Sequence, residues 1–175
     1  GNNQPGLVVK LDSDGNYVWH ATVDTPNGTI ESCAVHTDGS VYATGYFRTT
    51  GSVVASDVHH TGMGSNEDNA FVAKFSAAGT GEWFRSVGAK TAAATSYGWG
   101  IDVDSAGNVY ITGNFLRRVD LNLDDGVEDL HEATASVPGG KYWANTFFIK
   151  LDSAGNTQWS HSWGGPDSTI GTAVV

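Results

Sequence analysis

The sequence predicts an all-β protein built from repeated four-stranded units. Two features of composition support this fold class: 23 of the 175 residues are glycine, and six Trp, six Tyr and seven Phe accompany a charged fraction of only 16%. Glycine suits tight turns, and aromatic residues are enriched in strands. The third observation is an internal repeat. A hydrophobic fraction of 39% suits one compact domain or a segment of a larger one.

The first repeated motif is an apolar segment with a lysine, followed by a turn glycine and then a tryptophan. Its three copies are Lys10/Gly15/Trp19, Lys74/Gly79/Trp83 and Lys150/Gly155/Trp159. Both the lysines and the tryptophans are separated by 64 and then 76 residues. Alternating apolar positions on either side of an Asp-Ser-x-Gly-Asn turn, as in residues 12–16, predict a β-hairpin in each copy.

A second motif lies between the copies of the first. Residues 34–45 match residues 102–113 with a shift of 68, and both contain a Gly turn followed by Val-Tyr-x-Thr-Gly. Each full unit therefore contains two different hairpins, which makes four antiparallel strands. Within one segment spanning 1–175, we expect half a unit at 7–24, full units at 31–87 and 99–164, and the first strand of another unit at 168–175.

Four-stranded units arrayed in this way are typical of β-propeller blades, each of which buries its faces against its neighbours. A closed ring needs about four to eight blades. The sequence supplies about two and three-quarter blades, so we expect an incomplete ring or a fragment. A β-solenoid or a β-sandwich is the structural alternative.

Three segments carry a resemblance to a known family, namely residues 71–75, 100–115 and 159–167. Together they resemble the bacterial SBBP repeat, a seven-bladed β-propeller family of exported and surface proteins. The resemblance extends over nearly the whole chain in about two and a half copies. It implies a propeller fold and an extracellular or cell-surface bacterial location, and it implies no shared catalytic residues.

Charge and cysteine content narrow the functional classes. The formal charge of −10 disfavours nucleic acid and anionic membranes, and no apolar run is long enough for membrane insertion. The single cysteine, Cys33, excludes an internal disulfide and fits an exported bacterial protein. Because Cys33 aligns with Ile101 in a core strand, we expect it to be a buried small residue.

The acidic stretch 120–132 is the candidate metal site. It begins with oxygen ligands at alternate positions, Asp120, Asn122 and Asp124, followed directly by Asp125. This pattern is typical of the first half of a calcium loop, although His131 occupies the twelfth position. Ca²⁺ is therefore the one cofactor that the sequence suggests. The alternative is a solvated acidic loop between strands.

The aromatic residues divide into repeated and unrepeated positions. The repeated tryptophans are expected to pack between blades, and the repeated lysines to bond carbonyls of a neighbouring blade. The unrepeated residues are candidates for a surface that stacks sugars or binds protein: Tyr97, Trp99, Tyr142, Trp143 and Trp163.

These patterns favour a non-enzymatic propeller repeat module of an exported or cell-surface bacterial protein, acting as a scaffold or as an adhesion and binding platform. Two alternatives stay open: a self-assembling structural subunit of a surface filament or ring, and part of a propeller-based glycan lyase or hydrolase. Expected partners are proteins, glycans, or further copies or chains that complete the propeller. No catalytic residue is predicted.

Overall fold

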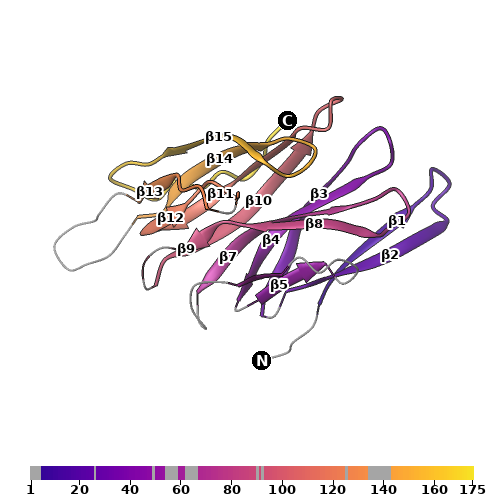
Figure 1. Cartoon of the computed structure of the whole chain (residues 1–175), viewed down its shortest axis with the longest axis horizontal. Coiled ribbons are helices and arrows are strands. Elements are labelled where there is room, and N and C mark those ends of the chain that lie inside the picture. Colours follow the sequence, from indigo (N-terminus) through magenta and orange to yellow (C-terminus); the bar gives the residue numbers. More distant parts are fainter. Residues whose placement is uncertain are drawn as a thin grey trace.

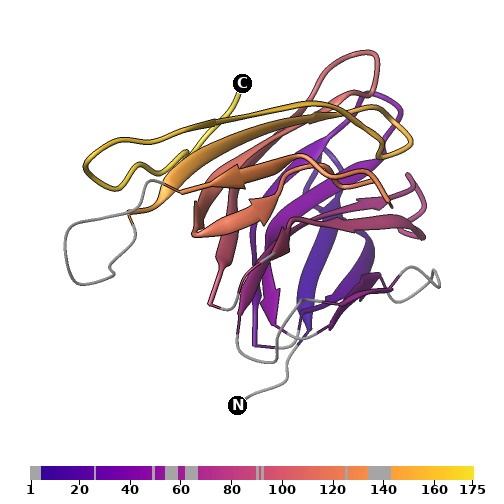
Figure 2. The ribbon, with the colours of Figure 1, turned by 60° about the vertical axis from the view of Figure 1, so that its left-hand side comes forward.

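The chain folds into antiparallel β-sheets in a computed structural model, which describes residues 5–25, 27–48, 50–53, 59–61, 67–89, 91, 93–124, 126–133 and 143–175. All regular structure in these ranges is β-strand, so the predicted all-β class is confirmed. Three four-stranded sheets and one three-stranded sheet are present. Figure 1 shows the larger sheets side by side in chain order, and Figure 2 shows their fan-like arrangement from another side.

Two of the sheets are complete blades of four antiparallel strands. The second blade has the order β3 (Thr29–Val35), β4 (Val41–Arg48), β7 (Asp68–Phe75) and β8 (Gly81–Ser86). The third blade has the order β10 (Thr95–Val103), β11 (Val109–Leu116), β14 (Asn145–Leu151) and β15 (Thr157–Trp163). The first blade contributes only the equivalents of the last two strands, β1 (Gly6–Leu11) and β2 (Tyr17–Asp24).

The short turns inside the blades follow from local side-chain chemistry. Asp12 Oδ1 accepts hydrogen bonds from the backbone amides of Asp14 (2.9 Å) and Asn16 (2.8 Å), and Gly15 adopts a φ of 83°. The same contacts recur at Asp104 and Asp152. An aspartate that caps the turn amides and a glycine at positive φ are what this hairpin loop requires.

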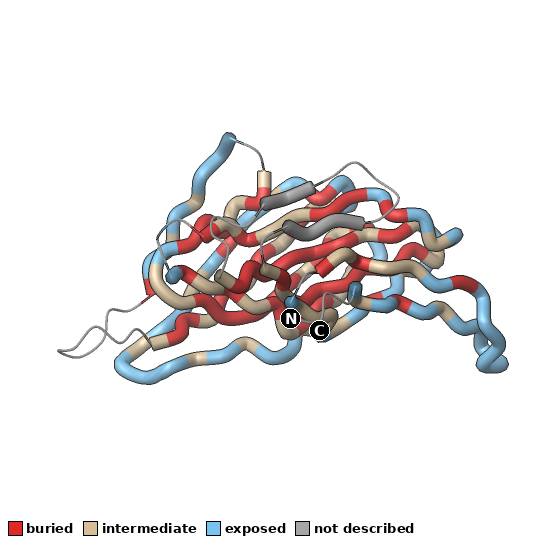
Figure 3. The backbone as a smooth tube through the Cα atoms, turned by 90° about the horizontal axis from the view of Figure 1, so that it is seen from below, coloured by how far each residue is buried: buried red, intermediate tan, exposed pale blue. Residues whose placement is uncertain are grey.

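The hydrophobic core consists of layers between neighbouring blades. One cluster joins the first and second blades and includes Val8, Trp19, Phe71, Phe75 and Phe84. A second cluster joins the second and third blades and includes Tyr42, Val72, Trp83, Ile111, Phe147, Ile149 and Leu151. In Figure 3 the buried residues run along the central strands, and the exposed residues lie mainly at the turns.

Two additional hairpins, absent from the sequence prediction, connect each complete blade to the blade before it. We call them the clasp hairpins: β5 (Thr50–Val53) with β6 (His59–Thr61), and β12 (Arg118–Asp120) with β13 (Leu130–Glu132). The first pairs with β2, and the second pairs with β9 (Gly88–Ala89), which follows β8. Each clasp therefore leaves its own blade between the second and third strands. The first extends the outer edge of the first blade, whereas the second forms a separate three-stranded sheet with β9.

The expected strand at 168–175 is not formed in the structure. A strand needs a neighbouring strand to form a ladder of hydrogen bonds, and no strand of the described ranges pairs with this segment. The segment nevertheless packs on the third blade as β10 packs on the second. A Cβ atom at Gly98 would lie 2.2 Å from Thr44 Oγ1, and one at Gly171 would lie 2.1 Å from Thr112 Oγ1. The domain boundaries themselves stay a prediction.

Candidate functional site

The repeated tryptophans bind the turn of the following blade. Trp19 Nε1 donates to the carbonyl oxygen of Ala77 at 2.8 Å, and Trp83 Nε1 donates to that of Ser153 at 3.3 Å. The two side chains are only 8% and 7% exposed. Each therefore buries its ring and satisfies its single donor at a blade junction, as the repeat predicts.

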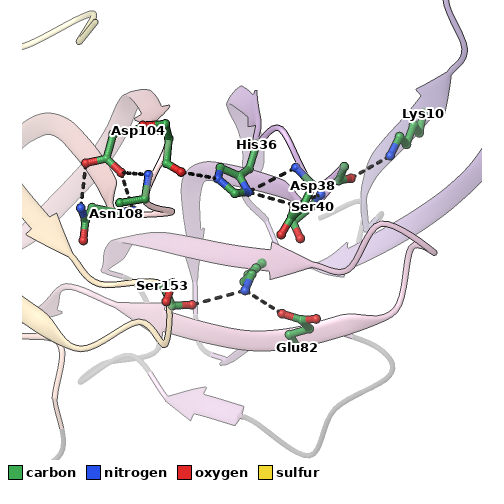
Figure 4. Close-up of polar contacts among 12 residues, drawn as sticks. Lys10, His36, Asp38, Ser40, Glu82, Asp104, Asn108 and Ser153 are labelled. Atoms are coloured by element: carbon green, nitrogen blue, oxygen red, sulfur yellow. Dashed lines mark hydrogen bonds and ion pairs between the residues drawn. The ribbon is translucent and has the colours of Figure 1, made fainter.

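The repeated lysines make parallel contacts, which Figure 4 shows in part. Lys10 Nζ donates to Gly39 O at 2.7 Å, and Lys74 Nζ lies 3.3 Å from Ser153 O and 2.9 Å from a carboxylate oxygen of Glu82. Desolvation by itself would lower the pKa of Lys74, but the hydrogen bond to Glu82 and the further interactions with Glu82 and Tyr42 together raise the pKa above its usual value. The predicted bonding of neighbouring carbonyls is confirmed for these two lysines.

The third copies of these residues lie on a face without a following blade in the described part of the chain. Trp159 is 37% exposed, and Lys150 lies over the ring of Tyr110 at 5.1 Å from its centroid. Neighbouring aromatic rings continue from Trp159 along this face: Phe148 and His161 stack on it with centroids 5.7 and 5.4 Å away, and Trp163 follows His161 at 5.8 Å. We call Tyr110, Phe148, Trp159, His161 and Trp163 the open aromatic face.

This face differs in side-chain size from the matching face of the second blade. Phe148 replaces the buried Val72, and Trp163, which is 57% exposed, replaces the buried Val87. The second blade presents small residues to a neighbour that already covers them. The third blade instead presents a broad aromatic surface, and exposed aromatic surface of this kind is typical of protein or ligand contacts.

The C-terminal segment forms one wall of this region. Thr146 N donates to Thr169 Oγ1 at 3.0 Å, which reproduces the bond from Ala70 N to Ser96 Oγ at the preceding junction. A pocket of about 440 Å³ remains between the segment and the sheet. Its lining residues are Asp102, Asp104, Tyr110, Phe148, Trp159, Val174 and Val175.

The five unrepeated aromatic candidates are separated in the structure. Tyr97 and Trp99 stack with centroids 5.7 Å apart, and Trp163 belongs to the open aromatic face. Trp143 is half-buried before β14, and Tyr142 lies outside the described residues. The structure therefore brings together Tyr97 and Trp99, and their role in binding stays a prediction.

Tyr97 and Trp99 belong to a polar and aromatic cluster that joins the second and third blades. Tyr97 OH donates to Asp68 Oδ2 at 2.6 Å, and Arg48 makes a two-point contact with the same carboxylate. Desolvation, aided by the hydrogen bond to Asp68, raises the pKa of Tyr97 to about 12. The phenol therefore stays protonated as a donor, and Trp99 Nε1 donates to Asn114 Oδ1. These contacts place Tyr97 at the blade junction, and Trp99 stacks on it from the same strand.

The candidate calcium residues accept hydrogen bonds from backbone amides of the acidic stretch and of β15. Asp120 Oδ1 accepts from the amides of Asn122 (3.0 Å) and Asp129 (2.9 Å), and Asn122 Oδ1 accepts from Asp124 N at 2.9 Å. Asp124 in turn accepts from Thr157 N on β15. Asp125 lies outside the described residues. Over the described ranges no three His, Cys, Asp or Glu side chains gather as a metal site, and calcium binding stays a prediction.

Sequence reasoning missed a cluster that holds the second clasp hairpin against β15. His131 Nδ1 lies 2.7 Å from Ser162 Oγ, His131 Nε2 lies 3.3 Å from Asp129 Oδ1, and Ser160 Oγ donates to Asp129 Oδ2. Desolvation opposes the change, but the hydrogen bonds from Ser160 and His131 lower the pKa of Asp129. Because residues 129–131 are distant in sequence from residues 160–162 and lie outside the repeated motifs, no local signal could have paired them.

The expected burial of Cys33 is wrong. It is exposed, although the equivalent Ile101 is only 6% exposed. Ile101 is covered by the inner strands of the second blade, whereas the first blade lacks its inner strands in the described chain. Burial at this position therefore depends on the neighbouring blade.

Comparison with known proteins supports the repeat assignment. Residues 82–114 match the sequence model of the SBBP family, described as a beta-propeller repeat. This region begins in β8 and runs through β10 and β11, so the match includes a blade junction. The chain thus contains an SBBP β-propeller repeat and is a propeller repeat module. No curated protein matches the chain significantly. The described residues include no helix that is long and apolar enough to cross a membrane.

Proposed function

We propose that this propeller module is a non-enzymatic scaffold and binding platform of an exported or cell-surface bacterial protein, and that the open aromatic face is its binding surface. The observation that carries the proposal is Trp159. It occupies the position of Trp19 and Trp83, whose indole groups both bind the turn of a following blade. Trp159 is exposed instead.

The internal junctions define the chemistry of the partner. Among the described residues, two donors on this face have no hydrogen-bond acceptor: Trp159 Nε1, and Lys150 Nζ, which lies over the ring of Tyr110. At both internal junctions a hairpin turn supplies a backbone carbonyl for the indole and a glycine against its ring, Gly79 or Gly155. The proposed partner is therefore a protein that presents a glycine-containing hairpin turn of the blade type.

The test uses the synthetic hairpin of residues 145–164, which carries the Gly155 turn, as a probe for the full chain. We expect saturable binding that slows hydrogen exchange of the Trp159 indole N–H in NMR. Trp159→Ala should abolish it, whereas Trp99→Ala, on β10 at the edge of the blade opposite β15, should not. The proposal would be overturned if the Trp159→Ala variant bound the hairpin equally well. It would also be overturned if the hairpin slowed the hydrogen exchange of none of the indole N–H groups. Binding of oligosaccharides to the face in place of the hairpin would contradict the proposed partner and favour a glycan.

Self-assembly is a second candidate, favoured by a specific observation at the other end of the module. Gly79 and Gly155 are covered by Trp19 and Trp83, but nothing lies within 4 Å of a Cβ atom at Gly15. The uncovered turn of Asp12–Asn16 in one copy could therefore pack against Trp159 of another copy, as the Gly79 and Gly155 turns pack against Trp19 and Trp83. This contact would be head-to-tail, so it would build rings or filaments.

Sedimentation over a range of protein concentrations tests self-assembly. Association should weaken with Trp159→Ala and with Gly15→Leu, which fills the turn surface. Gly126→Leu is the matched control, because Gly126 has a similar φ of 79° and nothing within 4 Å. A monomer at all concentrations, or equal weakening by the control, excludes this candidate.

A further inference from the structure

The first blade has a free strand edge at the end opposite the open aromatic face. In the second and third blades, the third strand pairs on one side with the second strand: β7 with β4, and β14 with β11. Within the described residues, the equivalent strand β1 pairs only with β2. The unpaired edge of β1 therefore offers backbone donors and acceptors to another strand.

The two complete blades show which strand fits such an edge. Tyr42 pairs with Lys74, and Tyr110 pairs with Lys150. In both blades the lysine ammonium group lies over the tyrosine ring, at 5.6 and 5.1 Å from its centroid. This cation–π contact is part of the repeat. In the first blade the equivalent lysine is Lys10, and no tyrosine lies opposite it in the pairing of β1 with β2.

A side-chain hydrogen bond fixes the same register. Thr44 Oγ1 donates to Phe71 O at 2.7 Å, and Thr112 Oγ1 donates to Phe147 O at 2.9 Å. Both phenylalanines lie three residues before the lysine of their strand, which is the position of Leu7 in β1. A strand with the pattern Val-Tyr-x-Thr-Gly would therefore place its tyrosine opposite Lys10 and its threonine hydroxyl at the carbonyl of Leu7.

The surface beside this edge is apolar and uncovered. A groove of about 260 Å³ is lined by Leu7, Val8, Val9, Lys10, Leu11, Cys33, Val35 and Val41. Val35 is 63% exposed and Cys33 is exposed. Their equivalents on β10, Val103 and Ile101, are packed against the second blade. The uncovered residues are thus those that the inner two strands of the first blade would cover.

We propose that the β1 edge and this groove form an acceptor site for the inner hairpin of an SBBP-type blade. The hairpin carries the Val-Tyr-x-Thr-Gly pattern seen in β4 and β11, pairs antiparallel to β1, and covers Cys33 and Val35. Main-chain bonds supply the affinity, and the Tyr–Lys10 and Thr–Leu7 contacts set the register. This site depends on the blade repeat alone, and it is separate from the open aromatic face.

The direct test adds a synthetic hairpin of residues 95–116 to the full chain and follows alkylation of Cys33 at fixed pH. Local desolvation raises the pKa of this thiol, so the comparison needs constant buffer conditions. We expect alkylation to slow by about tenfold near nine-tenths occupancy. Amide hydrogen exchange in β1 should slow at the same peptide concentrations.

Two controls make the result specific. A hairpin with Tyr110→Ala and Thr112→Val should protect Cys33 much less, because it lacks both register contacts. Trp159→Ala in the full chain should leave the protection of Cys33 by the hairpin unchanged, so a failure of the proposed function does not affect this test. Equal protection by the altered hairpin, or loss of protection in Trp159→Ala, would overturn the site.

A covalent form of the experiment covers the case in which the free peptide does not fold. The hairpin is joined to the N-terminus of the chain through a flexible Gly/Ser linker, which raises its effective concentration to the millimolar range. Cys33 in the fusion should be protected, and a fusion carrying the two hairpin substitutions should leave it reactive. A reactive Cys33 in both fusions excludes the proposed site.

Discussion

The junction of the second and third blades and the open aromatic face use the same repeated positions in opposite environments. Trp83 is 7% exposed and bonded to Ser153 O, whereas Trp159 is 37% exposed. Cys33 and Ile101 show the same contrast at the other side of a blade. The comparison teaches that in this fold burial belongs to a pair of adjacent blades, because a blade alone cannot cover its own faces.

The largest expected effect is the difference in stability between alanine variants of Trp83 and Trp159. Trp83→Ala should lower the free energy of unfolding by about 3–5 kcal/mol, because it opens a cavity in a packed junction. Trp159→Ala should lower it by about 1 kcal/mol or less, since the ring is already partly in water. Urea unfolding of both variants measures the difference. Equal losses would mean that the two faces are equally covered in solution.

A second pair of variants separates a covered turn from a bare one. Gly79 and Gly15 share a φ near 84°, but a Cβ atom at Gly79 would lie 2.7 Å from Trp19 Cδ2 and one at Gly15 would touch nothing. Gly15→Ala should cost about 1 kcal/mol from backbone strain, and Gly79→Ala about 2–3 kcal/mol because it also displaces the indole. Thermal unfolding checks the order, and the reverse order would contradict the junction contact.

A third comparison concerns the lysines. The Lys74 side chain is only 14% exposed and contacts Glu82 and Ser153 O. Lys74→Met should destabilise the protein by about 1 kcal/mol, a value reduced by the partial exposure of Glu82. Lys150→Met should change stability by less than about 0.5 kcal/mol. Denaturant midpoints measured in parallel distinguish the two, and a larger loss at Lys150 would argue that its face is covered.

The smallest effect is a pH dependence with opposite signs at equivalent turn positions. The hydrogen bond to Asp38, followed by that to Ser105 O, raises the pKa of His36. Its contribution to stability is therefore complete below the unfolded pKa of about 6.5 and is lost as pH rises through the folded pKa. The hydrogen bond from Asn108 lowers the pKa of Asp104 to about 2, so its contribution is present above the unfolded pKa and is lost as pH falls through about 2.

NMR titration of the two side chains checks both signs. His36 should titrate above the value of an unfolded control peptide, and Asp104 below it. His36→Gln should remove the upper pH dependence and leave the lower one. A His36 pKa at or below the peptide value would contradict the hydrogen bond to Asp38.

Much of the architecture could be predicted from local patterns. The Asp12 turn and its repeats, the four-strand order of a blade and the junction tryptophans all follow from motifs that recur at matched spacings. The clasp hairpins could not be predicted, because β5 and β12 pair with strands of the preceding blade and their sequences do not repeat. The separation of Trp163 from Tyr97 and Trp99 likewise depends on strand order, because β10 and β15 form opposite edges of the third blade.

The sequence by itself determined the repeated units, their turns and the residues available for each blade face. These are set by short-range chemistry: side-chain capping of turn amides, glycine at positive φ, and alternation of apolar residues along strands. Only the tertiary structure decided which copy of a repeated residue is core and which is surface. Cys33 and Trp159 have local patterns like those of Ile101 and Trp83, but a buried environment requires an adjacent blade, and hydrophobic burial is a property of the contact between the two.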